Sequence, residues 1–155
     1  MTKVVVVDSS CLIALSKIGR LDILQQLFER IAIPQAVYRE VVVKGHERPG
    51  SAEVGNAQWI AVHTVSNTLA VQALQLTLGA GESESIVLAE ELNADMVILD
   101  DRRARQSALE LTLPVVGTLA VLTHAWEQGY VQDLPAILAA LRAAGFHFAL
   151  ESLAR

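Results

Sequence analysis

Apolar residues along the chain fall into short continuous runs separated by longer segments with helical spacing. Residues 4–7 are a run of valines, which is typical of a strand buried on both faces of a parallel sheet. Residues 96–99 predict a second buried strand, and residues 114–116 predict a third. Residues 59–65 predict a short edge strand.

Helices are predicted between these strands, where apolar residues recur at helical spacing. They cover a short segment ending near residue 15, then residues 21–31, 35–43 and 69–78, a segment that opens at GAGESE and ends near residue 92, and residues 118–126 and 133–143. Pro34 suits the first position of its helix, and the polar segment 44–56 predicts a loop. The alternation predicts one α/β domain over residues 1–155, a three-layer domain with a central parallel sheet flanked by helices.

Acidic residues stand where two of the predicted buried strands end. Asp8 follows the first strand, and Asp100 and Asp101 follow the strand over residues 96–99. Right-handed crossovers bring the carboxyl ends of parallel strands to one edge of the sheet, where ligands bind in such folds. Like charges at that edge repel one another unless a cation intervenes, and carboxylate oxygens suit Mg²⁺ or Mn²⁺.

Two predicted helices add further carboxylates. At about 100° per residue, Glu40 lies on the flank of the apolar stripe of its helix and not on the purely solvent side. By the same geometry Glu82 lies near the direction of Ile86, whereas Glu84 points roughly to the opposite side. Glu82 is therefore the better inward candidate.

Each of these acids also has a purely structural interpretation. An aspartate after a strand can cap the helix that follows, and acids in a first helical turn complement the helix dipole. Glu40, beside Arg39, can be a solvated surface residue. The convergence of four separated acidic positions on one predicted edge favours a functional site.

Four segments, in this order and spacing, resemble the PIN-domain family, in particular compact bacterial and archaeal proteins similar to VapC-type toxins. They are VVVVDSSCLIALSKIGRLDIL, IPQAVYREVVVKG, LGAGESESIVLA and DMVILDDRRARQSA, which together span nearly the whole chain. The resemblance implies that the matching catalytic and metal-binding positions are Asp8, Glu40, Glu82 and Asp101. It adds Glu84 and Asp100 as neighbouring metal ligands. Ser10 matches a small polar position that orients Asp8 or a water, with hydrogen bonding at the helix N-terminus as the alternative.

The resemblance also implies an activity and partners. The expected activity is hydrolysis of RNA phosphodiester bonds by water with Mg²⁺ or Mn²⁺, in the toxin of a toxin–antitoxin pair. A small antitoxin protein and a homodimer are the expected partners. Two features depart from the commonest toxin pattern: Leu99 stands where a Thr often lies, and the central helix opens with GESES. A catalytically inactive PIN-like interaction module is the alternative function.

Composition narrows this interpretation. The 155 residues are 52% hydrophobic, enough to fill a substantial core, and the single cysteine, Cys11, excludes an intramolecular disulfide. No apolar run approaches membrane-spanning length, so we expect a cytoplasmic protein that does not contact membranes. The net charge of −5 opposes broad affinity for nucleic acid. Contact with RNA must then come from local basic groups, namely Arg102, Arg103, Arg105, Lys44, His46 and Arg48.

The last predicted helix carries an apolar stripe that suits either the core or a dimer interface. Its residues are Leu134, Ile137, Leu138 and Leu141. The core is the preferred interpretation.

Overall fold

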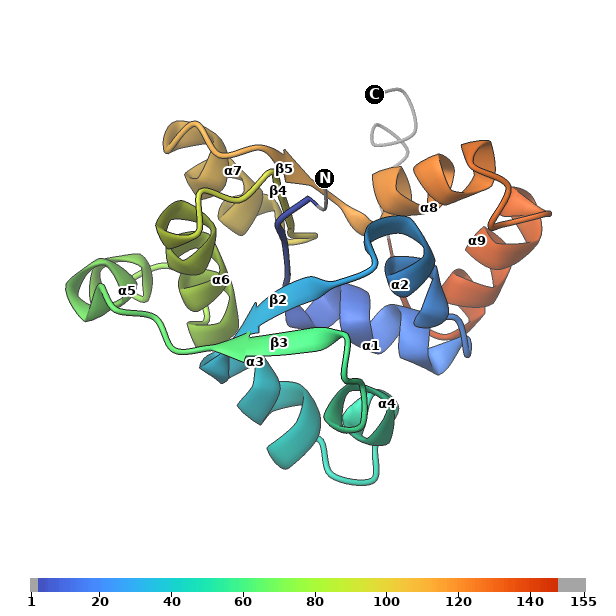
Figure 1. Cartoon of the computed structure of the whole chain (residues 1–155), viewed down its shortest axis with the longest axis horizontal. Helices are drawn as coiled ribbons and strands as arrows, with labels where there is room; N and C mark the ends of the chain where they lie inside the picture. The colour runs from blue at the N-terminus through green and yellow to red at the C-terminus, as the bar shows by residue number, and fades with distance from the viewer. Residues whose placement is uncertain (1–2, 148–155) are drawn as a thin grey trace.

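Five parallel strands form the centre of the computed structural model, which describes residues 3–147 (Figure 1). They are β1 (Val5–Val7), β2 (Ile31–Pro34), β3 (Ile60–His63), β4 (Met96–Ile98) and β5 (Val115–Val116). The order across the sheet is β3-β2-β1-β4-β5, and Val6 of β1 lies between Ala32 of β2 and Val97 of β4. Because all strands point the same way, the chain leaves β1 and β4 at the same edge of the sheet.

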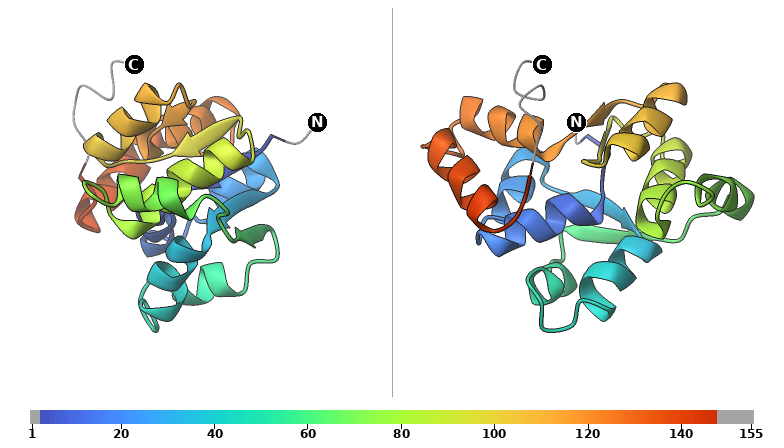
Figure 2. Two further views of the ribbon diagram at one scale, coloured as in Figure 1. Left: turned by 90° about the vertical axis from the view of Figure 1, so that its left-hand side faces the viewer. Right: turned by 180° about the vertical axis from the view of Figure 1, so that it is seen from behind.

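Helices cover both faces of the sheet, which confirms the predicted three-layer α/β fold (Figures 1 and 2). One face is covered by α1 (Ser9–Lys17), α2 (Asp22–Phe28), α8 (Thr118–Glu127) and α9 (Leu134–Ala143), and the other by α5 (Thr68–Leu74), α6 (Ala80–Glu91) and α7 (Arg102–Glu110). The remaining helices are α3 (Gln35–Tyr38), the π-helix η1 (Arg39–Val43) and α4 (Ser51–Gly55). Within residues 3–147, no helix has both the length and the apolar character needed to cross a membrane.

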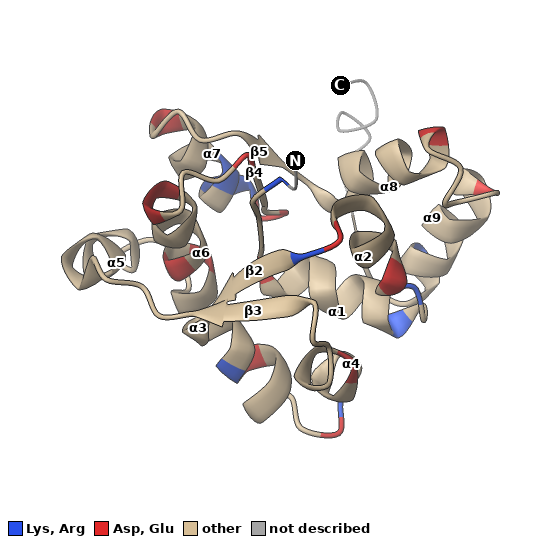
Figure 3. Ribbon diagram, in the orientation of Figure 1, with Lys and Arg blue, Asp and Glu red and all other residues tan. Residues whose placement is uncertain are grey.

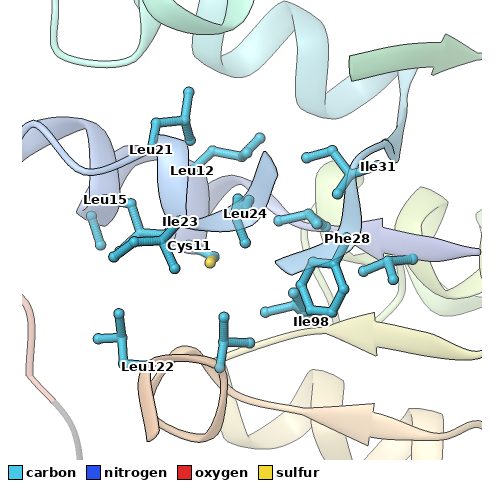
Figure 4. Packing of buried hydrophobic residues seen from close by; sticks show 14 of the residues in the cluster. Cys11, Leu12, Leu15, Leu21, Ile23, Leu24, Phe28, Ile31, Ile98 and Leu122 are labelled. Atoms are coloured by element: carbon cyan, nitrogen blue, oxygen red, sulfur yellow. The ribbon is translucent and has the colours of Figure 1, made fainter. Parts of the chain in front are cut away.

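The valines of β1 divide between two hydrophobic clusters. Val5 and Val7 belong to the cluster under α1, α2, α8 and α9, part of which is shown in Figure 4, whereas Val6 belongs to the cluster under α5, α6 and α7. This alternation follows from the two-residue period of a strand. All three valines are at most 1% exposed, and burying each contributes about 1.5–3 kcal/mol before entropy costs. Burial on both faces explains the continuous valine run.

The apolar stripe of α9 belongs to the core, as predicted. Ile137 and Leu141 are buried, and Leu134 and Leu138 pack partly buried against the cluster that contains β1 and α1. Cys11 is fully buried in the same cluster (Figure 4).

Three predicted boundaries are wrong. The helix predicted over residues 21–31 ends at Phe28, because Glu29 adopts a left-handed φ of 64° that turns the chain into β2. Ile31 is therefore the first residue of a strand that the pattern did not reveal. Pro34 ends that strand and precedes α3 with extended backbone, so it is not the first helical residue. The predicted loop over residues 44–56 contains α4.

The helix predicted over residues 35–43 changes type halfway along. After α3, the chain widens into η1, and the Lys44 N–H donates to the Arg39 carbonyl five residues earlier (2.7 Å). A π-turn rotates the residues within it away from α-helical positions and occurs frequently at functional sites. Glu40 lies in η1, so the wide turn decides where its carboxylate points.

Candidate functional site

Two carboxylates meet over a glycine at the carboxyl edge of the sheet. Asp8 follows β1 and is 5% exposed, and Glu40 reaches the same place from η1. A Cβ atom at Gly81, in the first turn of α6, would lie 3.0 Å from Glu40 Oε2 and 3.3 Å from Asp8 Oδ1. The Ser9 hydroxyl donates a hydrogen bond to the same Glu40 Oε2 (3.0 Å). The absence of a side chain at Gly81 therefore leaves room for both carboxylates.

The first turn of α6 supplies the third carboxylate. Glu82 is half-buried, and its Oε1 accepts a hydrogen bond from the Gly79 N–H (3.1 Å), which caps the helix. Burial raises the pKa of Glu82, and the charges of Asp101 and Glu40 raise it further, against the lowering effect of the Gly79 bond. Glu84 is placed differently, because its Oε1 accepts from the Ala36 N–H (3.0 Å) and so ties α6 to α3.

The two acids after β4 have different surroundings. Asp100 accepts three hydrogen bonds, each 2.7 Å long, from the Ser10 hydroxyl, the Thr118 hydroxyl and the Thr118 N–H. Asp101 is exposed and caps α7 by accepting from the Ala104 N–H (3.0 Å). The structural alternative of helix capping therefore holds for Asp101, and Ser10 orients Asp100 rather than Asp8.

The charge of Asp8 is poorly compensated. Burial raises the pKa of its carboxyl group from 3.8 to about 7, and the charges of Glu82, Glu40 and Asp100 act in the same direction. A hydrogen bond from the Ser9 backbone N–H opposes the rise. Asp8 thus lies within reach of three other acids, in surroundings that favour its neutral form unless a positive charge binds.

A pocket of about 410 Å³ opens beside these acids. Its lining includes Asp8, Glu40 and Glu82 at one end. It also includes Lys17, the last residue of α1, and Phe146, which follows α9. None of the six basic residues singled out in the sequence lines this pocket. Lys and Arg positions are instead spread over η1, α7, the end of α1 and the start of β2 (Figure 3).

The donor set fits a hard divalent cation in its chemistry. Carboxylate and hydroxyl oxygens surround Asp8, and a cation there would relieve the repulsion that raises the pKa of Asp8. Within residues 3–147, however, no group of three or more His, Cys, Asp or Glu side chains forms a ready-made metal site. Glu82 and Asp100 are engaged in hydrogen bonds with the protein.

Sequence reasoning missed four residues of this site: Ser9, Gly81, Thr118 and Lys17. Ser9 and Thr118 each lie two residues after the end of a strand, where polar side chains reach the edge of the sheet. Gly81 lies within GAGESE. The reason why a side chain does not fit there is the nearby carboxylates of Glu40 and Asp8, which are distant in sequence. For Lys17 the signal was its spacing from Ser10, which places both on one face of α1.

The fold and the acidic edge define an α/β protein with a carboxylate site at the carboxyl ends of its strands. The chain belongs to the PIN-domain family, since the sequence profile of a family described as PIN domain (DUF3368) matches residues 4–155. Members of this family are generally nucleases and typically bind divalent metal ions. The resemblance of the four sequence segments is thereby confirmed at the level of the family.

A solved structure supports the same fold. It is a PilT N-terminus domain protein, SSO1118, from the hyperthermophilic archaeon Sulfolobus solfataricus P2. The match has a TM-score of 0.54 at 20% sequence identity and covers 79% of this chain and 92% of the archaeal chain. At this identity the likeness concerns the fold alone. No curated protein matches the chain significantly.

Proposed function

We propose that this chain is a metal-dependent endoribonuclease that hydrolyses RNA phosphodiester bonds. The observation that carries the proposal is the meeting of the Asp8 and Glu40 carboxylates over Gly81, at one end of an open pocket. Membership of a family of nucleases supports the hydrolytic activity. RNA as the substrate rests on the resemblance to VapC-type toxins.

Asp8, Glu40 and Glu82 would hold the cation, Mg²⁺ or Mn²⁺, with Asp100 beside Asp8. When bound, such an ion neutralises charge on the phosphate and acidifies the attacking water. The chain's own residues position the carboxylates: Ser9 holds Glu40, and Ser10 and Thr118 hold Asp100. Asp101 and Glu84, which cap α7 and bind the backbone of α3, would contribute less to the metal site.

No covalent nucleophile is needed for this reaction. Cys11 is fully buried, and burial together with the charges of Asp100 and Asp8 raises the pKa of its thiol. The thiol therefore stays protonated and inert at neutral pH. The Ser9 hydroxyl donates its hydrogen to Glu40, which gives it a positioning role. Direct attack by water is the mechanism that these residues support.

A finer form of the proposal is that the chain is the toxin of a toxin–antitoxin pair acting in the cytoplasm. A small antitoxin protein would then cover the pocket, and a homodimer would be the expected assembly. A neighbouring reading frame that encodes a short DNA-binding protein would support this form.

The alternative is a catalytically inactive PIN-like interaction module. It is favoured by one observation: Glu82, Asp100 and Asp101 all accept hydrogen bonds that stabilise the fold. Titration with Mn²⁺, followed by calorimetry, separates the two functions. The nuclease binds Mn²⁺ and loses this binding in Asp8→Asn, whereas the inactive module shows no binding in either protein.

The decisive experiment is a cleavage assay with Mn²⁺ on a mixture of structured and single-stranded RNAs. Asp8→Asn keeps the size of the side chain but removes its charge, so we expect a loss of cleavage of at least about 100-fold. Asp22→Asn, which removes an exposed carboxylate paired with Arg20, is the matched control and should cleave like the parent. Equal cleavage by the parent and Asp8→Asn would point to a contaminating nuclease and refute the mechanism.

A further inference from the structure

One face of α1 connects the carboxylates to a lysine. Ser10, Ile13, Ala14 and Lys17 all line the pocket, and their spacing of three, four and seven residues places them on one side of the helix. These residues form one wall of the pocket, which extends roughly 10 Å along the helix axis from Ser10 to Lys17.

The pocket changes character along this wall. The acidic end holds Asp8, Glu40 and Glu82, whereas apolar atoms of Ile13, Ala14 and Phe146 lie farther along the same lining. Lys17 supplies a positive charge to the lining. A pocket with an acidic end, an apolar wall and an ammonium group suits a ligand that alternates phosphates with flat, apolar-faced groups.

Lys17 keeps hydrogen-bonding capacity for a ligand. Its ammonium group donates one hydrogen bond of 3.3 Å to the Ala144 carbonyl, which leaves two of its three N–H donors. The ion pairs within residues 3–147 are Arg20 with Asp22 and His46 with Glu47, so no acid in this range neutralises Lys17. An exposed ammonium group with one backbone partner can bind a phosphate at little desolvation cost.

We propose that Lys17 binds a phosphate of the RNA substrate at the far side of this pocket, one nucleotide away from the cleavage point. The base or ribose of that nucleotide packs against Ile13, Ala14 and Phe146, while the scissile phosphate lies at Asp8. The inference rests on the proposed function for the acidic end and adds a substrate-binding residue. A pocket of about 410 Å³ has room for a single unstacked nucleotide between the two phosphates.

The test measures how RNA affinity depends on salt. A short fluorescent single-stranded RNA is titrated with Asp8→Asn protein, which leaves the RNA intact, and its anisotropy is followed at several KCl concentrations. Each phosphate contact to a single strand contributes about 0.7 to the slope of log affinity against log salt. Adding Lys17→Gln should reduce that slope by about 0.7 and weaken binding about tenfold at low salt.

Matched variants isolate the charge of Lys17. Gln retains an N–H donor for the Ala144 carbonyl, and Lys17→Arg, which retains the charge, should keep the slope of the parent. Lys3→Gln removes a lysine at the amino end of β1, at the other edge of the sheet from Asp8, and should leave the slope unchanged. Equal thermal unfolding of the variants verifies that each is folded.

Specific outcomes overturn the inference. An unchanged slope in Lys17→Gln, or an equal loss in Lys3→Gln, refutes the phosphate contact. Failure of the parent to cleave RNA with Mn²⁺ would instead refute the nuclease function, while a Lys17-dependent slope would still establish the binding site.

Discussion

The carboxyl ends of β1 and β4 both carry aspartates, but the protein satisfies their charges differently. Asp100, after β4, accepts three hydrogen bonds from Ser10 and Thr118. Asp8, after β1, is buried and, within residues 3–147, accepts no hydrogen bond from a side chain. The same sequence pattern, an acid at the end of a buried strand, therefore produces one charge with three hydrogen bonds from Ser10 and Thr118 and one that is poorly compensated, by the Ser9 backbone N–H.

The difference indicates what each end is for. Satisfied hydrogen bonds fix Asp100 in place, so its charge costs the fold little. The charge of Asp8 costs stability, because burial and three neighbouring acids raise its pKa to about 7. Proteins retain such an uncompensated group mainly at functional sites. The end of β1 is thus where a cation would have its largest effect.

The largest expected effect, which tests the difference between Asp8 and Asp100, is the pH dependence of stability caused by titration of Asp8. Between its ordinary pKa of 3.8 and the folded value of about 7, the folded chain holds a proton that the unfolded chain has released. This group's contribution to the metal-free free energy of unfolding is therefore greatest at acidic pH. It falls by on the order of 4 kcal/mol as pH rises through about 7.

Urea denaturation in EDTA at several pH values measures this fall. Asp8→Asn lacks the titrating group and should not show this fall. The free energy of unfolding of the variant should therefore exceed that of the parent by more at pH 8 than at pH 5. The pKa of Glu82 is also raised, so in both proteins this residue adds a smaller decrease in the free energy of unfolding as pH rises. Parallel pH profiles for the parent and Asp8→Asn would show that the buried charge at the end of β1 is compensated after all.

A second way acts on geometry rather than charge. In Gly81→Ala the new methyl group would lie 3.0 Å from Glu40 Oε2 and 3.3 Å from Asp8 Oδ1, so both carboxylate groups must move by a few tenths of an ångström. The displaced atoms are ends of side chains, and alanine favours a helix, so stability should change by less than about 1 kcal/mol. Cleavage should fall about 10- to 100-fold, because small misplacements at a site are costly.

Gly79→Ala is the matched control for this substitution. A Cβ at Gly79 would meet Glu82 Oε1 at 3.5 Å, an ordinary contact, so neither Asp8 nor Glu40 needs to move. Parallel cleavage rates and circular dichroism of both variants provide the measurement. Equal losses of activity would show that the start of α6 matters only as a whole, and that the space at Gly81 has no particular role.

The sequence predicted the acids at strand ends well and their contacts poorly. Four valines before Asp8 and an apolar run before Asp100 place both acids at one edge, because strands buried on both faces are typical of a parallel sheet. Glu40 was placed with an α-helical period, whereas its true direction depends on the π-turn of η1. Strand β2 was missed because Ile31 matches the helical spacing of the preceding leucines.

The choice between neighbouring acids also lay beyond the sequence pattern. Whether Asp100 or Asp101 faces Asp8 depends on Thr118, which reaches Asp100 from the start of α8. Which of Glu82 and Glu84 turns toward the pocket was predicted, because residues two apart on a helix point to roughly opposite sides. Glu84 accordingly binds the Ala36 N–H instead. Local periodicity therefore predicts a face, and contacts between distant segments select the residue on it.

The smallest expected effect sharpens the comparison at the end of β4. If Asp101 is only the cap of α7, Asp101→Ser should keep the hydrogen bond to the Ala104 N–H, and with it both stability and cleavage. Asp101→Ala should lose about 1 kcal/mol of stability, measured by urea denaturation, and little activity. Asp101 also raises the pKa of Glu82, so removing its charge should lower the pKa of Glu82. A loss of cleavage of about 100-fold in Asp101→Ser, with stability unchanged, would make Asp101 the metal ligand that the family resemblance implies and reduce Asp100 to a half-buried structural acid.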